Sequence, residues 1–129
     1  MRDGTAEQKV KAAAALWNLS YNDDNRVAIA KAGGIVPLVA LARDGTDVHK
    51  EMAAGALCYL ATNAGNRVAI AEAGGVPLLV ELTRHGTDMH KKLGAAALSN
   101  LAFNDAESQV AIAEAGGISE QLVARLCLS

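Results

Sequence analysis

The chain has 129 residues, of which 51% are hydrophobic and only 3% aromatic, so Ala, Leu, Val and Ile must build its core. Its 12 basic and 14 acidic residues are interspersed and give a net charge of -2, which argues against nucleic acid as the main partner. The sequence shows neither an apolar signal-peptide core nor an apolar run of about 18 residues. We therefore expect no membrane contact and a cytoplasmic or nuclear location.

A repeat with a period of about 41 residues organises the chain. Gly-Thr recurs at 4–5, 45–46 and 86–87, and Ala-Ile-Ala-(Lys/Glu)-Ala-Gly-Gly recurs through the chain, at 28–34, 69–75 and 111–117. A fixed period of roughly 20 to 50 residues is typical of proteins that stack identical units. Such proteins build a continuous core and present an extended face, so binding is the leading hypothesis for function.

In chain order, the pattern predicts an isolated helix over 5–20, full three-helix repeats over 25–63 and 66–104, and two final helices over 109–128. The isolated helix corresponds to the third helix of a repeat, and the final two correspond to a first and a second helix. We therefore expect one domain, residues 1–129, that is cut between the second and third helices of the repeat.

The repeat over 25–63 shows the expected start and stop signals of each helix. Asn25 is predicted to cap a short first helix that stops at Gly33-Gly34. Pro37 is expected in the first turn of the second helix, where its missing N–H costs nothing. Thr46 is predicted to cap a third helix that runs to about residue 62.

The run Asn-Arg-Val-Ala-Ile-Ala-Glu-Ala-Gly-Gly at 66–75, followed by Val-Pro-Leu-Leu-Val-Glu-Leu and by Ala-Ala-Ala-Leu-Ser-Asn-Leu-Ala at 95–102, resembles the armadillo repeat. The resemblance covers essentially the whole chain, and the short helix over 66–73 argues against the two-helix HEAT repeat. It implies an all-α, right-handed armadillo solenoid of about three repeats. It also implies that the third helices line a concave groove that binds proteins, often as extended segments, without enzymatic activity.

The resemblance further implies that an asparagine near the end of each third helix reads the backbone of a bound peptide. The matching residues are Asn18, Tyr59 and Asn100, so this row is broken in the middle repeat. Members that bind basic segments are similar in carrying a tryptophan four residues earlier. This chain has none there, so basic import signals are not expected. The alternative is that Asn18 and Asn100 only cap or solvate helix ends.

Two further side chains have one binding interpretation and one structural interpretation each. Trp17 either anchors a partner from the groove margin or packs between helices. Met52 shares a helical stripe with Tyr59, and it suits either a partner's apolar side chain or the core.

A cationic row is formed by Lys9, Lys50 and Lys91, which are in register, and it is joined by Lys92 and by the pair His49 and His90. The row either guides an acidic segment onto the groove edge or is a solvated face. The histidines also suggest a metal site, but no carboxylate or cysteine completes a ligand set, so no metal is expected.

No arrangement typical of catalysis or of cofactor binding is found. The serines and cysteines lack a suitably placed histidine in the same unit, and the Gly-Gly pairs are helix stops rather than phosphate loops. Cys58 and Cys127 lie on apolar stripes, which favours buried, reduced thiols over a disulfide.

The incomplete repeats at the two ends provide an alternative function, which is self-association. The first helix would expose apolar residues, and the last unit lacks a third helix of its own. One copy's first helix could then complete another copy's last unit, in open filaments or closed rings. A polar residue, Gln121, in the last unit argues instead for a capped end. The residues expected in self-association are Val10, Leu16, Leu19, Leu122 and Leu126.

Overall fold

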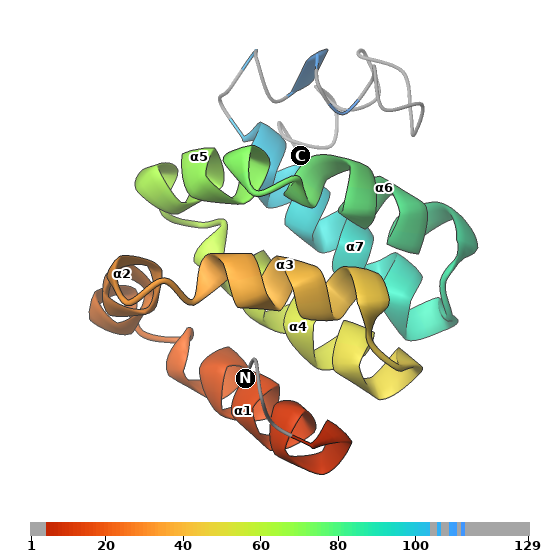
Figure 1. Cartoon of the computed structure of the whole chain (residues 1–129). Coiled ribbons are helices and arrows are strands. Elements are labelled where there is room, and N and C mark those ends of the chain that lie inside the picture. The colour runs from red at the N-terminus through yellow and green to blue at the C-terminus, as the bar shows by residue number, and fades with distance from the viewer. Residues whose placement is uncertain (1–4, 104–105, 107–108, 111, 113–129) are drawn as a thin grey trace.

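A computed structural model describes residues 5–103, 106, 109–110 and 112, and these residues contain seven α-helices. The helices are α1 (Ala6–Leu19), α2 (Asp23–Lys31), α3 (Ile35–Asp44), α4 (Asp47–Leu60), α5 (Ala64–Glu72), α6 (Gly75–His85) and α7 (Asp88–Ala102). Helices α1, α4 and α7 lie side by side, and we call them the third-helix layer (Figure 1). Helices α3 and α6 pack on α4 and α7, and α2 and α5 lie at one edge. The described helices comprise one third helix followed by two sets of three; the two helices expected over 109–128 lie largely outside the described residues.

Every third helix begins with the same reciprocal cap. The threonine hydroxyl accepts a hydrogen bond from the backbone N–H three residues later, and that residue's side chain accepts one from the threonine N–H. The three pairs are Thr5 with Gln8, Thr46 with His49, and Thr87 with His90. The predicted role of Thr46 is therefore confirmed.

The predicted cap of the first helix, Asn25, is wrong by three residues. Helix α2 begins at Asp23, and Asn22 caps it, because the Asn22 Oδ1 accepts from the N–H groups of Asp24 and Asn25. In the next repeat Asn63 has the same role. The prediction did not consider Asn22, which lies three residues before Asn25 and offers the same capping oxygen.

The second helices explain why the two prolines are out of register in the sequence. Helix α6 begins one residue earlier in the repeat than α3, so Pro37 and Pro77 are both the third residue of their helix. At the start of each second helix, the first glycine of the pair adopts the expected left-handed conformation, with φ of 80° at Gly33 and 85° at Gly74. The reversal that this conformation allows turns the chain from the first helix into the second.

A single apolar core runs through the stack, built from small and aliphatic side chains of all seven helices. The largest fully buried ones are Leu38, Leu57, Leu60, Ile70, Leu79, Leu101 and Ile112. Within the described part, no single helix is long and apolar enough to span a membrane. Helices α2 and α3 together have the length and apolar composition of such a span, but they are bent by 86° relative to each other.

Candidate functional site

All four aromatic side chains of the chain lie at the C-terminal ends of the third helices. Trp17 is in the last turn of α1 and Tyr59 in that of α4, while Tyr21 and Phe103 follow α1 and α7. Tyr21 is 57% exposed and Phe103 is 51% exposed, and the other two are half-buried. We call these four residues the aromatic edge. Large aromatic side chains are usually buried, so this partly exposed set is a candidate contact surface.

Two tyrosines of the aromatic edge contact each other across neighbouring repeats. The ring centroids of Tyr21 and Tyr59 are 4.5 Å apart, and the ring planes are inclined by 56°. A hydrogen bond with the Tyr21 side chain raises the pKa of Tyr59, and partial desolvation raises it further. Tyr59 therefore occupies the middle of the predicted asparagine row as part of a tyrosine pair.

Trp17 packs on α4 at a residue that has no side chain. A Cβ atom on Gly55 would lie 2.4 Å from Cε2 of the Trp17 ring, so the glycine makes room for the indole. The indole remains half-buried, and its Nε1 is buried without a hydrogen-bond partner among the described residues. The ring thus both joins α1 to α4 and contributes to the aromatic edge.

The two asparagines of the predicted row differ in their surroundings. Asn18 is exposed on α1. The side-chain amide of Asn100 instead donates to the Cys58 carbonyl of α4 at 2.8 Å, with the Cys58 Sγ at 3.6 Å. A carbonyl in the last turn of α4 thereby receives a partner that the helix does not supply. Burial raises the pKa of the Cys58 thiol.

The remaining predicted binding residues do not share one surface. Met52 is half-buried and packs against the core. Lys50 lies toward α6, where it lines a hollow with Glu81 and Leu82. Lys91 is exposed on α7.

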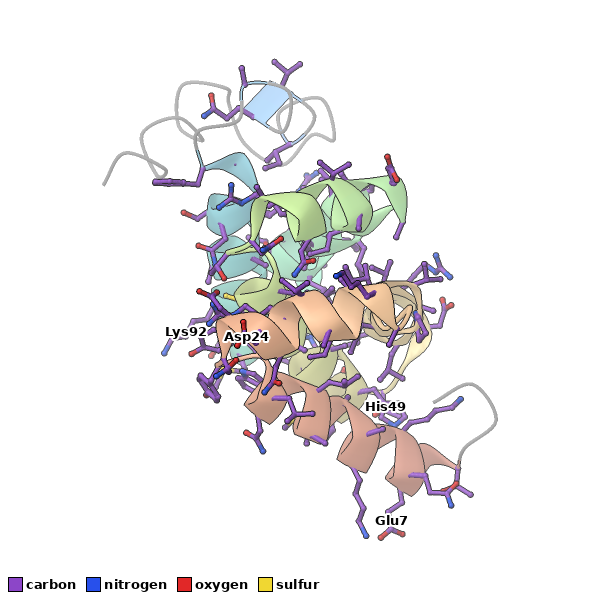
Figure 2. All side chains as sticks on the ribbon, turned by 90° about the vertical axis from the view of Figure 1, so that its left-hand side faces the viewer. Glu7, Asp24, His49 and Lys92 are labelled. Carbon is purple, nitrogen blue, oxygen red and sulfur yellow. The ribbon has the colours of Figure 1, made fainter. Side chains whose placement is uncertain are left out.

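Figure 2 shows two sides of the molecule. Lys92 points to the left, and Asp24, at the start of α2, lies on the same side. His49 lies on the right, where it lines a hollow with residues of α3. The structure thus packs Trp17 on Gly55 of α4 and pairs Tyr59 with Tyr21, whereas Lys50 lines the hollow beside α6.

The prediction that His49 and His90 extend a cationic row is wrong, because both side chains are buried. The Nδ1 of His90 accepts from the Thr87 N–H at 3.2 Å, and its Nε2 lies 2.7 Å from the Asp47 carbonyl. Since a carbonyl only accepts, Nε2 carries the ring proton and donates it across the two repeats. In the described part of the chain, no three His, Cys, Asp or Glu side chains are grouped so that they could hold a metal ion.

Sequence reasoning missed the two arginines that hold the corner between a third helix and the next first helix. The Arg67 Nε donates to the Ala61 carbonyl at 2.8 Å, and its guanidinium also donates to the Thr62 carbonyl at 3.1 Å. Its guanidinium carbon lies 5.8 Å from the centroid of the Phe103 ring, so it also supports the aromatic edge. Arg26 makes the equivalent bonds one repeat earlier. The repeated Asn-Arg pair was the signal that could have revealed them.

Two of the residues predicted for self-association lie at the lower end of the stack. Leu16 is half-buried, and Leu19 is 48% exposed. The Val10 side chain, Leu122 and Leu126 lie outside what the structure describes.

Comparison with known proteins identifies the repeat. A family model of the armadillo/beta-catenin-like repeat matches the chain twice, over residues 22–62 and 63–103. No curated protein sequence matches significantly.

Solved structures of designed and engineered proteins share the fold. An engineered protein from the Northeast Structural Genomics Consortium is 32% identical, with a TM-score of 0.83 over 89% of this chain and 47% of its own. A computationally designed armadillo repeat protein for modular peptide recognition is 26% identical, and a designed armadillo repeat protein in complex with the peptide (KR)4 is 24% identical. Their TM-scores are 0.86 and 0.84, each over 98% of this chain and 59% of their own.

The chain therefore spans only 47% to 59% of the length of these structures. Because the two family matches together run from residue 22 to residue 103, which is more than half of the 129 residues, the chain belongs to the armadillo repeat family, and its fold is an all-α armadillo solenoid.

Proposed function

We propose that this chain is a non-enzymatic binding module that holds an extended peptide segment of a partner protein across the third-helix layer. The observation that carries the proposal is the aromatic edge, because every aromatic side chain of the chain lies at the C-terminal end of a third helix, and Tyr21 and Phe103 are about half exposed. Aromatic side chains are the residues that most often dominate the energy of protein interfaces.

The family supports a binding role in general terms. Armadillo repeats form a typical non-enzymatic binding scaffold, and one structure similar to this chain was designed for modular peptide recognition. Repeat proteins of this kind bind through extended surfaces that neighbouring units build together.

The peptide's backbone would be read mainly at Asn18. This side chain is exposed, and its amide offers one donor and one acceptor, which matches a peptide unit. Asn100 would contribute less as a donor, since its amide nitrogen already bonds the Cys58 carbonyl. The Tyr21 and Tyr59 rings would contact side chains of the peptide beside Asn18.

The spacing of the helices is compatible with a peptide that crosses the third-helix layer. Neighbouring helices pack about 8 to 10 Å apart, and an extended chain advances about 3.3 Å per residue. A peptide that crosses the third-helix layer would therefore offer two to three residues to each helix, so α1 and α4 together would hold a segment of roughly five residues.

The test is a selection of linear peptides from a random phage-displayed library on the immobilised chain, followed by calorimetric titration of a selected peptide. Tyr21→Ala should weaken binding roughly tenfold, because it removes an exposed aromatic contact. Asn18→Ala should weaken it by a similar factor through the loss of backbone hydrogen bonds.

The matched control is Val36→Ala, which shortens a side chain that is 66% exposed on α3, away from the third-helix layer. It should leave the affinity unchanged. The proposal fails if the library yields no binder, or if the selected peptides bind both Tyr21→Ala and Asn18→Ala as tightly as the unchanged chain.

A further inference from the structure

Two opposite charges lie on the outer face of the third-helix layer, on two neighbouring helices. Glu51 of α4 and Lys92 of α7 are 41 residues apart and therefore hold the same position of the repeat. Gly94 faces α6, because a Cβ atom on it would lie 2.5 Å from the Thr83 Oγ1. Lys92 lies two residues earlier, about 200° around the helix, and so faces away from α6. Figure 2 agrees, since Lys92 points away from the side on which His49 lies beside α3.

Glu51 lies next to the aromatic edge and in the interior of the stack. It is one helical turn before Gly55, the residue on which the Trp17 ring packs, and residues four apart share one face of a helix. Helix α4 packs against α1 on one side and against α7 on the other. Glu51 is half-buried between them. Its carboxylate is therefore part of the surface that the proposed peptide crosses.

Neither charge is neutralised by the described residues. The side chains of Glu51 and Lys92 form no ion pair there, whereas Glu7 of α1 pairs with Lys11 at 3.3 Å. The position of α1 that is in register with Glu51 holds an uncharged residue, Val10. From α1 to α7, this position of the repeat is thus neutral, then negative, then positive. A half-buried carboxylate without a partner gains from a cation brought beside it.

We propose that these two charges set the order of side chains in the bound peptide, which carries a basic residue over α4 and an acidic residue over α7. The inference rests on the proposed function, because it concerns the same surface. Neighbouring helices are about 8 to 10 Å apart and an extended chain advances about 3.3 Å per residue, so the two charged residues are two to three positions apart. The basic one is nearer to the part of the peptide that contacts Asn18 and Tyr21 of α1.

The order of the charges excludes other charged segments. A peptide with the two charges exchanged would place like charges opposite each other on both helices, which costs affinity. A segment that is only basic gains at Glu51 and loses at Lys92, and a segment that is only acidic does the reverse. The surface therefore selects a segment of mixed charge.

The experiment selects linear peptides from one random phage-displayed library on the unchanged chain and on the exchange variant Glu51→Lys with Lys92→Glu. Peptides from the unchanged chain should carry the basic residue nearer to the part that contacts α1, and peptides from the exchange variant should carry the acidic residue there. In titrations, a peptide selected on the unchanged chain should bind Glu51→Lys roughly tenfold more weakly, and high salt should reduce this difference. Circular dichroism verifies that each variant keeps its helices.

The matched control is the double variant Lys31→Glu with Glu81→Lys. It makes the same two exchanges on exposed residues of α2 and α6, outside the third-helix layer, and it should select the same peptides as the unchanged chain.

Binders without this charge order would overturn the inference, and so would an order that the exchange variant does not reverse. The proposed function would then still stand, provided that Asn18→Ala and Tyr21→Ala weaken the binding of those peptides. A library that yields no binder would overturn both.

Discussion

The two complete repeats pack their second helix on their third with different side chains at the same positions. In the first repeat these positions hold Ala42 and Ala53, and both are fully buried. In the second they hold Thr83 and Gly94. A Cβ on Gly94 would lie 2.5 Å from the Thr83 Oγ1, whose hydroxyl donates to the Leu79 carbonyl. The larger residue on α6 is thus matched by a smaller one on α7.

The joints between repeats show the same exchange. Trp17 packs on Gly55 where α1 meets α4, and the corresponding positions where α4 meets α7 hold Cys58 and Ala96. The helices keep their spacing because the volume added on one side of a contact is removed on the other. A single residue of such a pair is therefore explained only by its partner, which lies about 11 residues away within a repeat or about 38 residues away across a joint.

Changing one member of the pair in the second repeat should have the largest effect. Gly94→Ala should lower the free energy of unfolding by about 1 to 3 kcal/mol, because its methyl group collides with Thr83. The double variant Thr83→Ala with Gly94→Ala copies the first repeat. It should be at least as stable as the unchanged chain, since alanine favours a helix interior over glycine by up to about 1 kcal/mol. Urea unfolding of the four proteins of this cycle gives the coupling.

If the two substitutions change the free energy of unfolding independently, Thr83 is not the reason for the glycine at residue 94, and the comparison between the repeats is wrong. Leu79 provides a check within the cycle, because its carbonyl would lie 3.2 Å from the new methyl group in both alanine variants. A double variant that remains destabilised would identify this carbonyl, and not the threonine, as the limiting contact.

The joint between α1 and α4 should respond in the same direction but more weakly. Gly55→Ala should cost about 1 kcal/mol, because the half-buried indole of Trp17 has room to shift. In the Trp17→Cys variant, which copies residue 58 of the next joint, the effect of Gly55→Ala should change sign. There it should raise the free energy of unfolding by up to about 1 kcal/mol. Thermal and urea unfolding measure both steps. The same sign in both backgrounds would show that the tryptophan is not the reason for the glycine.

The smallest effect concerns the tyrosine pair. The pKa of Tyr59 is raised in the folded chain, so the pair contributes stability below the ordinary tyrosine pKa of about 10, and this contribution is lost as pH rises through the folded value. Tyr21→Phe removes the hydrogen bond, and the pKa of Tyr59 should fall back toward its ordinary value. An absorbance titration of the phenolate in Tyr21→Phe, with Tyr59→Phe as the matching subtraction, measures it. An unchanged midpoint for Tyr59 would show that Tyr21 does not set the shift.

The arrangement of helices was predictable because its signals are local. A threonine cap, a glycine pair and an early proline each act within about four residues, and their recurrence fixes the length of the unit. The start of α2 was predicted three residues late because Asn22 and Asn25 are equally good caps by type. Only the stacked structure shows that the residue equivalent to Asn25 is used between repeats, where Asn66 bonds Arg26.

The candidate site was predictable only in part, because its contacts join residues about 36 to 42 apart in the sequence. The register of the repeat aligned Asn18, Tyr59 and Asn100. It did not reveal that the Asn100 amide donates a hydrogen bond to the Cys58 carbonyl. Nor did periodicity distinguish the side of a helix that faces a neighbouring repeat from the side that faces solvent, which is why Lys50 was grouped with the binding residues. The buried histidines were mistaken for surface charge for the same reason.

The single tryptophan lies at the joint between α1 and α4. Its fluorescence therefore reports the undocking of α1 from α4, whereas far-ultraviolet circular dichroism reports all helices at once. Stacked repeats interact only with their neighbours, so they can unfold one unit at a time. The chain thus contains its own probe of cooperativity. If the unfolding midpoints from fluorescence and from circular dichroism coincide, the solenoid unfolds as one unit, and a difference between them shows that α1 separates from α4 before the other helices unfold.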